Sequence, residues 1–187
     1  MKEKIENIQN KIDILSLKRL TVLSEKNDII PFSSFWEKGQ VIIIFIRHFG
    51  CPSCKAHVSD IWNQQSKLKN KRIIFIGNGQ PSMIKGFKEE INSPSVEIYT
   101  DPSLETFEAC GLKRGLRYLM NFKSIKSLLD LKRRGYDMSS WDDQLGDKTQ
   151  MGGVIVLKKP GVLLYHFVSS YLGDFDSSKD WKTVDIS

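Results

Sequence analysis

Two cysteines separated by two residues are the part of this sequence best suited to chemistry. Cys51 and Cys54 enclose Pro52 and Ser53 and follow the apolar run at residues 41–46. A thiol pair at this spacing lies one helical turn apart and forms a disulfide without moving the backbone. The pair therefore predicts a dithiol that alternates between a reduced and an oxidised state.

The flanking residues predict that this pair sits at a strand-to-helix junction. Residues 41–46 are all β-branched or aromatic, which indicates a strand buried on both faces. Pro52 suits the first position of a helix, and the apolar residues after it recur at helical spacing, namely Val58, Ile61, Trp62 and Leu68. The unpaired amides of that first turn favour a thiolate at Cys51. We therefore expect Cys51 to be the exposed sulfur of low pKa, with Cys54 one turn deeper.

Two residues before the pair are candidates for tuning the pKa of Cys51. Arg47, or His48 in its protonated form, would place positive charge beside the thiolate. For His48 a structural hydrogen bond is an equally good interpretation.

Two other interpretations of the cysteines stay open. A CxxC pair can be half of a zinc site, but the other candidate ligands are scattered along the chain: Cys110, His48, His57 and His166. The pair could also be two buried, inert thiols, since Cys is among the most buried residue types. A position at a helix start favours redox chemistry over both, so the sequence predicts no metal and no cofactor.

Length and composition limit the class of protein. The chain has 187 residues, 40% of them hydrophobic, and three cysteines. A chain of this size buries a proper core, and three cysteines are too few and odd in number for a secreted disulfide scaffold. The N-terminus lacks the apolar core of a signal peptide, and no apolar run approaches the roughly 20 residues of a membrane span. We therefore expect a soluble, cytoplasmic protein that does not span a membrane.

The rest of the pattern predicts strands that alternate with helices, which implies a parallel core sheet. We expect one domain over residues 1–187, with an N-terminal helical extension at residues 1–19. The expected strands are residues 20–24, 29–32, 72–76 and 96–99. The expected helices are residues 83–91 and a short helix that begins at Asp101. A β-hairpin of residues 154–157 and 162–168 is expected after Gly152 and Gly153.

Residues 112–150 interrupt this alternation with a helical and loop insertion that is strongly basic. Residues 112–134 hold eight Lys or Arg and one acid, Asp130, so their charge of +7 exceeds the +6 of the whole chain. A solvated face is the ordinary interpretation, and a site for an acidic substrate or an anionic membrane surface is the alternative. No nucleic-acid motif accompanies these charges. Tyr136 and Trp141 could cover the cysteines, or simply pack.

The motifs together resemble a known family. The segments that carry the resemblance are residues 46–55, residues 99–103, the basic insertion, Gly146 and Asp147, residues 150–154, and Gly173 and Asp174. With them the sequence resembles the peroxiredoxin-like branch of the AhpC/TSA-type thioredoxin-fold proteins, the group that includes the prostamide/prostaglandin F synthases. The resemblance runs from about residue 20 to residue 174. It implies an α/β, thioredoxin-like fold with a central mixed sheet flanked by helices. It also implies that Cys51 is the redox-active sulfur and Cys54 its partner.

The sequence departs from ordinary peroxiredoxins at three places. His48 stands three residues before Cys51, where peroxiredoxins carry Thr, and Ile44 stands seven before, where they carry Pro. The arginine that peroxiredoxins place before the late strand is missing from residues 150–153. Gly152 and Gly153 also occupy the loop that faces the CxxC, where thioredoxin-like proteins hold a cis-proline. Efficient peroxide turnover therefore does not follow from the sequence.

The sequence thus predicts a thiol-disulfide redox protein whose Cys51 attacks a disulfide or a peroxide and whose Cys54 resolves the product. A cellular dithiol such as thioredoxin would restore the pair, and a homodimer is possible. The alternatives are a lipid-peroxide or endoperoxide reductase that uses the same dithiol, and a non-catalytic binding module that uses the basic insertion.

Overall fold

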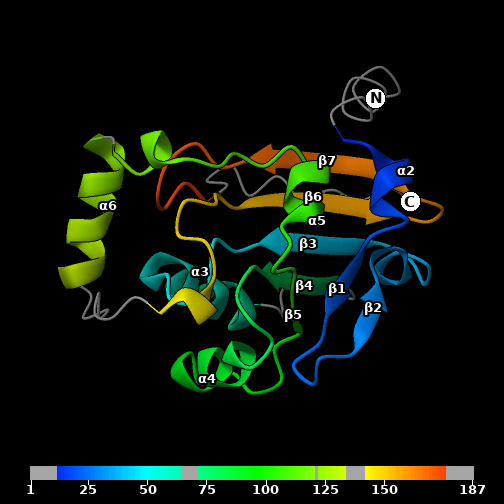
Figure 1. Cartoon of the computed structure of the whole chain (residues 1–187), viewed down its shortest axis with the longest axis horizontal. Helices are drawn as coiled ribbons and strands as arrows, with labels where there is room; N and C mark the ends of the chain where they lie inside the picture. The colour runs from blue at the N-terminus through cyan, green and yellow to red at the C-terminus, as the bar shows by residue number, and fades with distance from the viewer. Residues whose placement is uncertain (1–11, 65–70, 121, 134–141, 176–187) are drawn as a thin grey trace.

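A mixed β-sheet lies at the centre of the computed structural model, which describes residues 12–64, 71–120, 122–133 and 142–175. Within these residues the sheet has seven strands in the order β2-β1-β5-β4-β3-β6-β7 (Figure 1). Strands β3, β4 and β5 are parallel to one another, and the other pairings are antiparallel. The strands are β1 (Thr21–Leu23), β2 (Ile29–Pro31), β3 (Val41–Phe45), β4 (Arg72–Gly77), β5 (Ile98–Thr100), β6 (Gly153–Lys158) and β7 (Val162–Val168).

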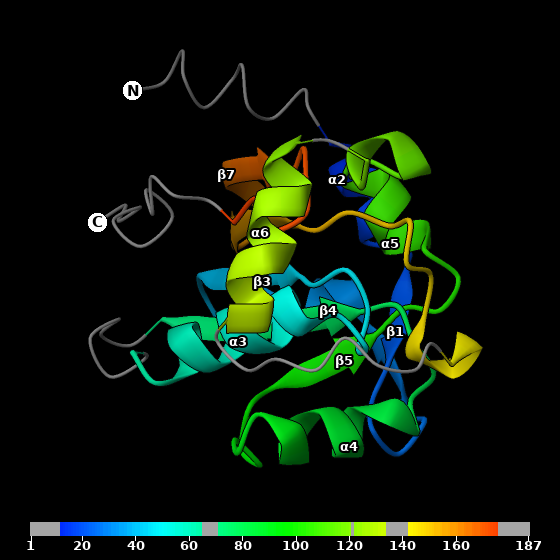
Figure 2. The same cartoon turned by 90° about the vertical axis from the view of Figure 1, so that its left-hand side faces the viewer.

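Helices cover both faces of this sheet (Figures 1 and 2). One face packs against α3 and α4, and the other against α2, α5 and the 3-10 helix η1. The helical elements are α2 (Ile14–Leu17), η1 (Phe32–Phe35), α3 (Pro52–Trp62), α4 (Met83–Glu90), α5 (Glu105–Ala109), η3 (Leu116–Tyr118), α6 (Phe122–Arg133) and η4 (Asp143–Leu145). The α/β class with a mixed central sheet is thereby confirmed.

The central strand β3 shows why the sheet needs two helical layers. Ile42 and Ile44 belong to the core cluster beneath α3 and α4, whereas Ile43 and Phe45 belong to the cluster on the opposite face. All five residues of the strand are buried. Because successive side chains point to opposite faces, an unbroken apolar run needs cover on both sides.

Several element boundaries differ from those expected from the sequence. Helix α5 begins at Glu105 rather than near Asp101, because the buried Asp101 carboxylate accepts hydrogen bonds from the Thr106 amide and hydroxyl, both at 2.7 Å. Leu104 takes a left-handed conformation there, with φ of 66°. Helix α3 ends at Trp62, and Leu68 lies outside the described residues.

The two expected helical additions are described only in part. At the N-terminus, Asp13 caps the short helix α2, and residues 1–11 of the expected extension lie outside the described residues. In the basic insertion, η3 and α6 are two separate elements rather than one helix. Arg134, Tyr136 and Trp141 also lie outside the described residues. Among the helices that are described, none has the length and apolar character needed to cross a membrane.

Two glycines provide a test of this packing. A methyl group at Gly152, just before β6, would collide with the carbonyl oxygen of Phe45, whereas one at Gly86 in α4 would meet nothing within 4 Å. Gly152→Ala should therefore lower the free energy of unfolding by about 1–3 kcal/mol through overpacking. Gly86→Ala should raise it by about 0.5–1 kcal/mol through helix propensity. Urea unfolding measures both, and equal stability of Gly152→Ala and the unmodified protein would contradict the described packing.

Candidate active site

The two cysteines lie where β3 passes into α3, as expected from the sequence. Cys51 occupies the residue before the helix, and Pro52 begins its first turn. Cys54 lies one turn further on and is completely buried against the sheet. Both are free thiols in this structure.

Three donors surround the two sulfur atoms. The Arg47 guanidinium donates from Nη1 to Cys51 Sγ at 3.3 Å, and the Ser53 hydroxyl lies 3.0 Å from the same sulfur. The Arg47 backbone amide donates to Cys54 Sγ at 3.3 Å. The Cys54 thiol in turn hydrogen-bonds to Cys51. The two sulfurs therefore face each other, with the charge of Arg47 on the Cys51 side.

These contacts move the pKa values of the two thiols in opposite directions. Burial opposes ionisation of Cys51, but the Cys54 hydrogen bond, the charges of Arg47 and His48 and the Ser53 hydroxyl together hold its pKa well below the ordinary 9.0. Burial, the hydrogen bond to Cys51 and the negative charge on Cys51 raise the pKa of Cys54 well above that value. Such a division into one thiolate and one thiol is what an attacking and a resolving cysteine require.

The Arg47 side chain is fixed by the backbone of a distant segment, residues 142–150. Its Nε donates to the carbonyl oxygen of Gln150 at 3.1 Å and its Nη2 to that of Lys148 at 2.5 Å. The turn that presents these carbonyls is held by Asp147, whose carboxylate accepts hydrogen bonds from Thr149 and an ion pair from Arg114. The guanidinium is thus positioned before any substrate arrives.

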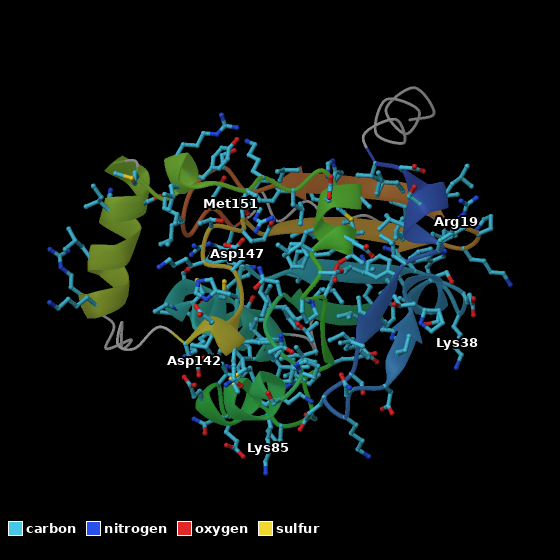
Figure 3. All side chains as sticks on the ribbon, viewed as in Figure 1. Arg19, Lys38, Lys85, Asp142, Asp147 and Met151 are labelled. Carbon is cyan, nitrogen blue, oxygen red and sulfur yellow. The ribbon has the colours of Figure 1, made fainter. Side chains whose placement is uncertain are left out.

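The burial of Cys51 corrects the expectation of an exposed sulfur. Its exposed fraction is only 1%. The 142–150 segment lies over the loops that follow β3 and β4, where the Phe49 amide donates to the Leu145 carbonyl at 2.9 Å and Gln80 pairs with Gln144. Leu145 packs against the core cluster that contains Cys51. Figure 3 shows this part of the chain, with Asp142, Asp147 and Met151 labelled. A segment almost a hundred residues away in the sequence therefore packs against the loop that carries Cys51.

His48 was the other candidate for tuning Cys51, and its burial disfavours the protonated form that this role needs. Burial, the largest cause, lowers the pKa of His48 from 6.5 to about 4, although a Cys51 thiolate acts in the opposite direction. Arg47 contributes the larger positive charge beside Cys51, and the charge of His48 acts on the Cys51 pKa in the same direction.

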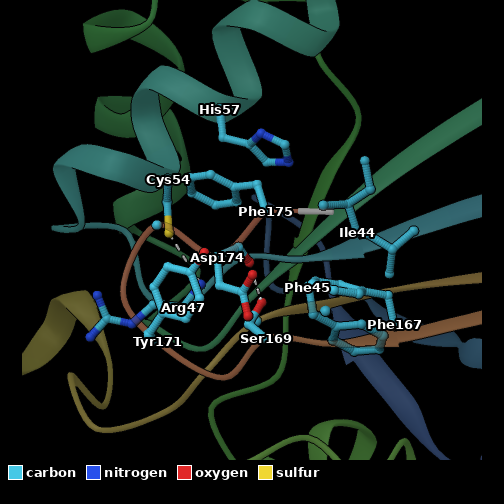
Figure 4. A pocket seen from close by; sticks show the side chains of 14 residues that line it. Ile44, Phe45, Arg47, Cys54, His57, Phe167, Ser169, Tyr171, Asp174 and Phe175 are labelled. Atoms are coloured by element: carbon cyan, nitrogen blue, oxygen red, sulfur yellow. Dashed lines mark hydrogen bonds between the residues drawn. The ribbon is translucent and has the colours of Figure 1, made fainter. Parts of the chain in front are cut away.

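Gly152 and Gly153 lie beside Cys54, in the facing position that the sequence suggested. They line a small pocket of about 10 Å³ together with Cys54 and Arg47 (Figure 4). Their backbone is already paired, since the Gly152 carbonyl accepts from the Ser169 amide at 3.1 Å and Gly153 pairs with Phe45 and Val168 in the sheet. The volume is close to that needed for one water molecule, so the pocket has no room for a peptide.

The other wall of this pocket comes from segments that the sequence did not connect to the cysteines. His57 stacks on Phe175 with ring centroids 3.8 Å apart, and Tyr171 and Asp174 line the same space (Figure 4). Sequence reasoning also missed Ser53, although a hydroxyl between two cysteines was a usable signal. The carbonyls of Lys148 and Gln150 could not be found from the sequence, because every residue has a backbone carbonyl and the sequence does not mark the ones that bind a side chain.

Cys110 and His166 lie apart from this site. Cys110 belongs to the core cluster on the opposite face of the sheet from Cys51, and burial raises its thiol pKa. The ring Nε2 of His166 lies 2.9 Å from the Cys110 carbonyl oxygen. Neither residue contributes to the chemistry of the Cys51 and Cys54 pair.

Comparison with known proteins identifies relatives along most of the chain. Residues 60–170 match a family model described as AhpC/TSA antioxidant enzyme, and this match begins after the cysteine pair. Human peroxiredoxin-like 2C is 32% identical over 150 residues, which are 74% of this chain and 65% of that protein. This chain therefore spans just under two thirds of the length of the human relative. Prostamide/prostaglandin F synthase of Aquarana catesbeiana is 28% identical over 174 residues, covering 86% of this chain and 83% of that one.

Solved structures agree with the fold. Peroxidoxin BcpB from Mycobacterium tuberculosis superposes with a TM-score of 0.57 at 13% identity, covering 90% of this chain and 94% of that one. At this identity the likeness concerns the fold alone, which is thioredoxin-like.

The contact between Arg47 and Cys51 predicts a pKa change that can be measured. Arg47→Gln should raise the pKa of Cys51 by about 1–2 units, because a neutral amide no longer stabilises the thiolate. Arg47→Lys keeps the charge and should raise it less. Ultraviolet thiolate absorbance across pH, taken relative to Cys51→Ser, measures the shift. An unchanged titration in Arg47→Gln would show that the guanidinium does not act on this sulfur.

The lowered pKa of His48 predicts a stability change in mild acid. As the pH falls, the unfolded state takes up the proton near 6.5 and the folded state only near 4. The stabilisation from neutral His48 is thus complete above pH 6.5, and about 3 kcal/mol is lost as the pH falls to 4. Urea unfolding should show this loss, reduced in His48→Gln. The same acid dependence in both proteins would place the titrating group elsewhere.

Proposed function

Since this chain belongs to the AhpC/TSA antioxidant enzyme family, we propose that it is a thiol-disulfide oxidoreductase of peroxiredoxin-like type that acts through Cys51 and Cys54. The observation that carries the proposal is the hydrogen bond from the Arg47 guanidinium to Cys51 Sγ, at 3.3 Å, at a sulfur whose pKa the Cys54 thiol also lowers. A structural thiol buried in a core has no need of a charged donor.

The proposed reaction has three balanced steps. With a peroxide, the Cys51 thiolate attacks one oxygen, the O–O bond breaks, and the leaving oxygen takes up a proton to give an alcohol or water. Cys51 is now a sulfenic acid, and Cys54 displaces its hydroxyl as water to form the intramolecular disulfide. A dithiol reductant such as thioredoxin then exchanges with this disulfide, becomes oxidised itself and returns both cysteines to thiols.

Two side chains supply the donors that the peroxiredoxin pattern would place elsewhere. Ser53, two residues after Cys51, brings a hydroxyl to the attacking sulfur, although the position three before it carries His48. Arg47 brings a guanidinium from the end of β3, and the carbonyls of Lys148 and Gln150 hold it in place. Fixed donors of this kind stabilise developing negative charge without reorganising during the reaction. These contacts support a role for Arg47 and Ser53 in activating Cys51.

The burial of Cys51 restricts what reaches the sulfur. Because Cys51 is 1% exposed, a protein disulfide makes contact with its sulfur only after the groups around it move. The pocket of about 10 Å³ beside Cys54 and Arg47 does not reach Cys51, so it offers no path for a bulky substrate to the attacking sulfur. We therefore favour a small peroxide over a protein disulfide as the substrate of the closed form.

The redox cycle also indicates a cellular compartment and a reductant for this protein. A dithiol that must be reduced after each cycle works in a reducing compartment, so we propose the cytoplasm. We propose the whole chain as one thioredoxin-like domain that takes its electrons from a cellular dithiol, with neither nucleic acid nor a metal taking part.

A second candidate is reduction of a lipid peroxide or an endoperoxide by the same pair. It is favoured by the likeness to prostamide/prostaglandin F synthase. Turnover with hydrogen peroxide, a lipid hydroperoxide and an insulin-type disulfide separates the candidates. A binding module with no catalysis would turn over none of them, and there Cys51→Ser would be without effect.

Each cysteine variant should give a different oxidation product. After mild peroxide treatment, Cys54→Ser should accumulate a sulfenic acid at Cys51, because no thiol is left to resolve it. Cys51→Ser should form neither a sulfenic acid nor a disulfide, and Cys110→Ser should react as the unmodified protein does. Peptide mass spectrometry with a dimedone trap measures all three. Equal reactivity of Cys51→Ser and the unmodified protein would exclude Cys51 as the attacking sulfur.

A further inference from the structure

Helix α6 presents an outer face that the redox site does not use. The face consists of Ile125, Lys126, Leu129, Lys132 and Arg133, all of them exposed. Ile125 and Leu129 are each 55% exposed, which is unusual for large apolar side chains. Figure 1 shows α6 beyond α3, at one edge of the molecule, and Figure 2 views it from that side.

The residues of this face are ordered by polarity around the helix. At about 100° per residue, Ile125 and Leu129 lie only about 40° apart and form one apolar stripe. Lys132 borders the stripe on one side, and Arg133 and Lys126 border it on the other. The opposite side of the helix faces the protein, where Ser124 is buried and accepts a hydrogen bond from the Leu172 amide at 3.0 Å. The helix is thus held by one side while the apolar stripe and its flanking cations point away.

The charge around this face limits what can cover it. Residues 112–134 carry +7, so the face lies within the most basic part of the chain. A second copy of the chain in a two-fold contact would set these cations against themselves. A soluble acidic protein would need a groove shaped to Ile125 and Leu129. A lipid surface needs none, because acyl chains accept shallow apolar side chains while anionic headgroups attract lysine and arginine.

We propose that the outer face of α6 docks this protein onto an anionic membrane surface. Ile125 and Leu129 enter the headgroup region, and Lys126, Lys132 and Arg133 contact the anionic headgroups. Met120, 80% exposed just before α6, extends the apolar contact. The binding is peripheral and reversible, and it falls as salt screens the charges.

Sedimentation of the full-length protein with vesicles tests the proposal. Vesicles of phosphatidylcholine that contain phosphatidylserine should bind it, and vesicles of phosphatidylcholine alone should bind it far more weakly. Lys126→Gln with Arg133→Gln should weaken binding by about 25-fold, since each basic residue near an anionic surface contributes about fivefold. Ile125→Gln with Leu129→Gln should weaken it by about tenfold or more.

Matched control variants separate this face from general effects. Lys85→Gln with Lys159→Gln removes two exposed charges elsewhere, and Leu15→Gln with Ile29→Gln removes two exposed apolar side chains. Both controls should bind within about threefold of the unmodified protein. Circular dichroism checks that every variant is folded.

Three results would overturn the proposal. The first is equal binding to neutral and anionic vesicles, or to neither, and the second is α6 variants that bind as tightly as the controls. The third is a dimer in light scattering that Ile125→Gln with Leu129→Gln dissociates, since a second copy would then cover this face. None of these depends on the chemistry of Cys51, so the proposed function is tested separately.

Discussion

The hydrogen bond between the Arg47 guanidinium and the Cys51 sulfur is the interaction on which this site depends. A buried thiol ordinarily stays protonated, because a low-dielectric surrounding disfavours the charged form. Here the guanidinium, the Ser53 hydroxyl and the Cys54 thiol reverse that preference at a sulfur with 1% exposure. The guanidinium contributes more to this than His48, whose own pKa is lowered by burial to about 4.

The fold positions this interaction through three segments far apart in sequence. Arg47 lies two residues after β3 (Val41–Phe45), whose residues are paired on both sides, with β4 and with β6. Helix α3 sets the two cysteines one turn apart. The 142–150 segment supplies the carbonyls that hold the guanidinium and also packs against the loop that carries Cys51. One segment therefore contacts both the group that activates Cys51 and the loop that holds it.

The parts of the structure that could be predicted from sequence are those with local signals. The apolar run of β3, the cysteine spacing and the Gly152 and Gly153 pair before the last hairpin located the strand, the helix start and the facing loop. The exposure of Cys51 could not be predicted, because residues 142–150 pack against its loop, and no local pattern reports a contact across almost a hundred residues. The lowered pKa of His48 could not be predicted for the same reason, since its burial depends on tertiary packing. The hydrogen bonds that hold Arg47 could not be predicted, because their acceptors are backbone carbonyls, which every residue has.

The central claim is that Cys51 is a thiolate with a resolving partner in reach near neutral pH. Its most direct test is the mass of the intact, unmodified protein over time after one equivalent of hydrogen peroxide near neutral pH, with the cysteines mapped in peptides. The protein should rapidly lose two hydrogen atoms, with Cys51 and Cys54 joined in one disulfide and Cys110 still a free thiol. Two cysteines that stay reduced near neutral pH and react only in alkaline solution would contradict it.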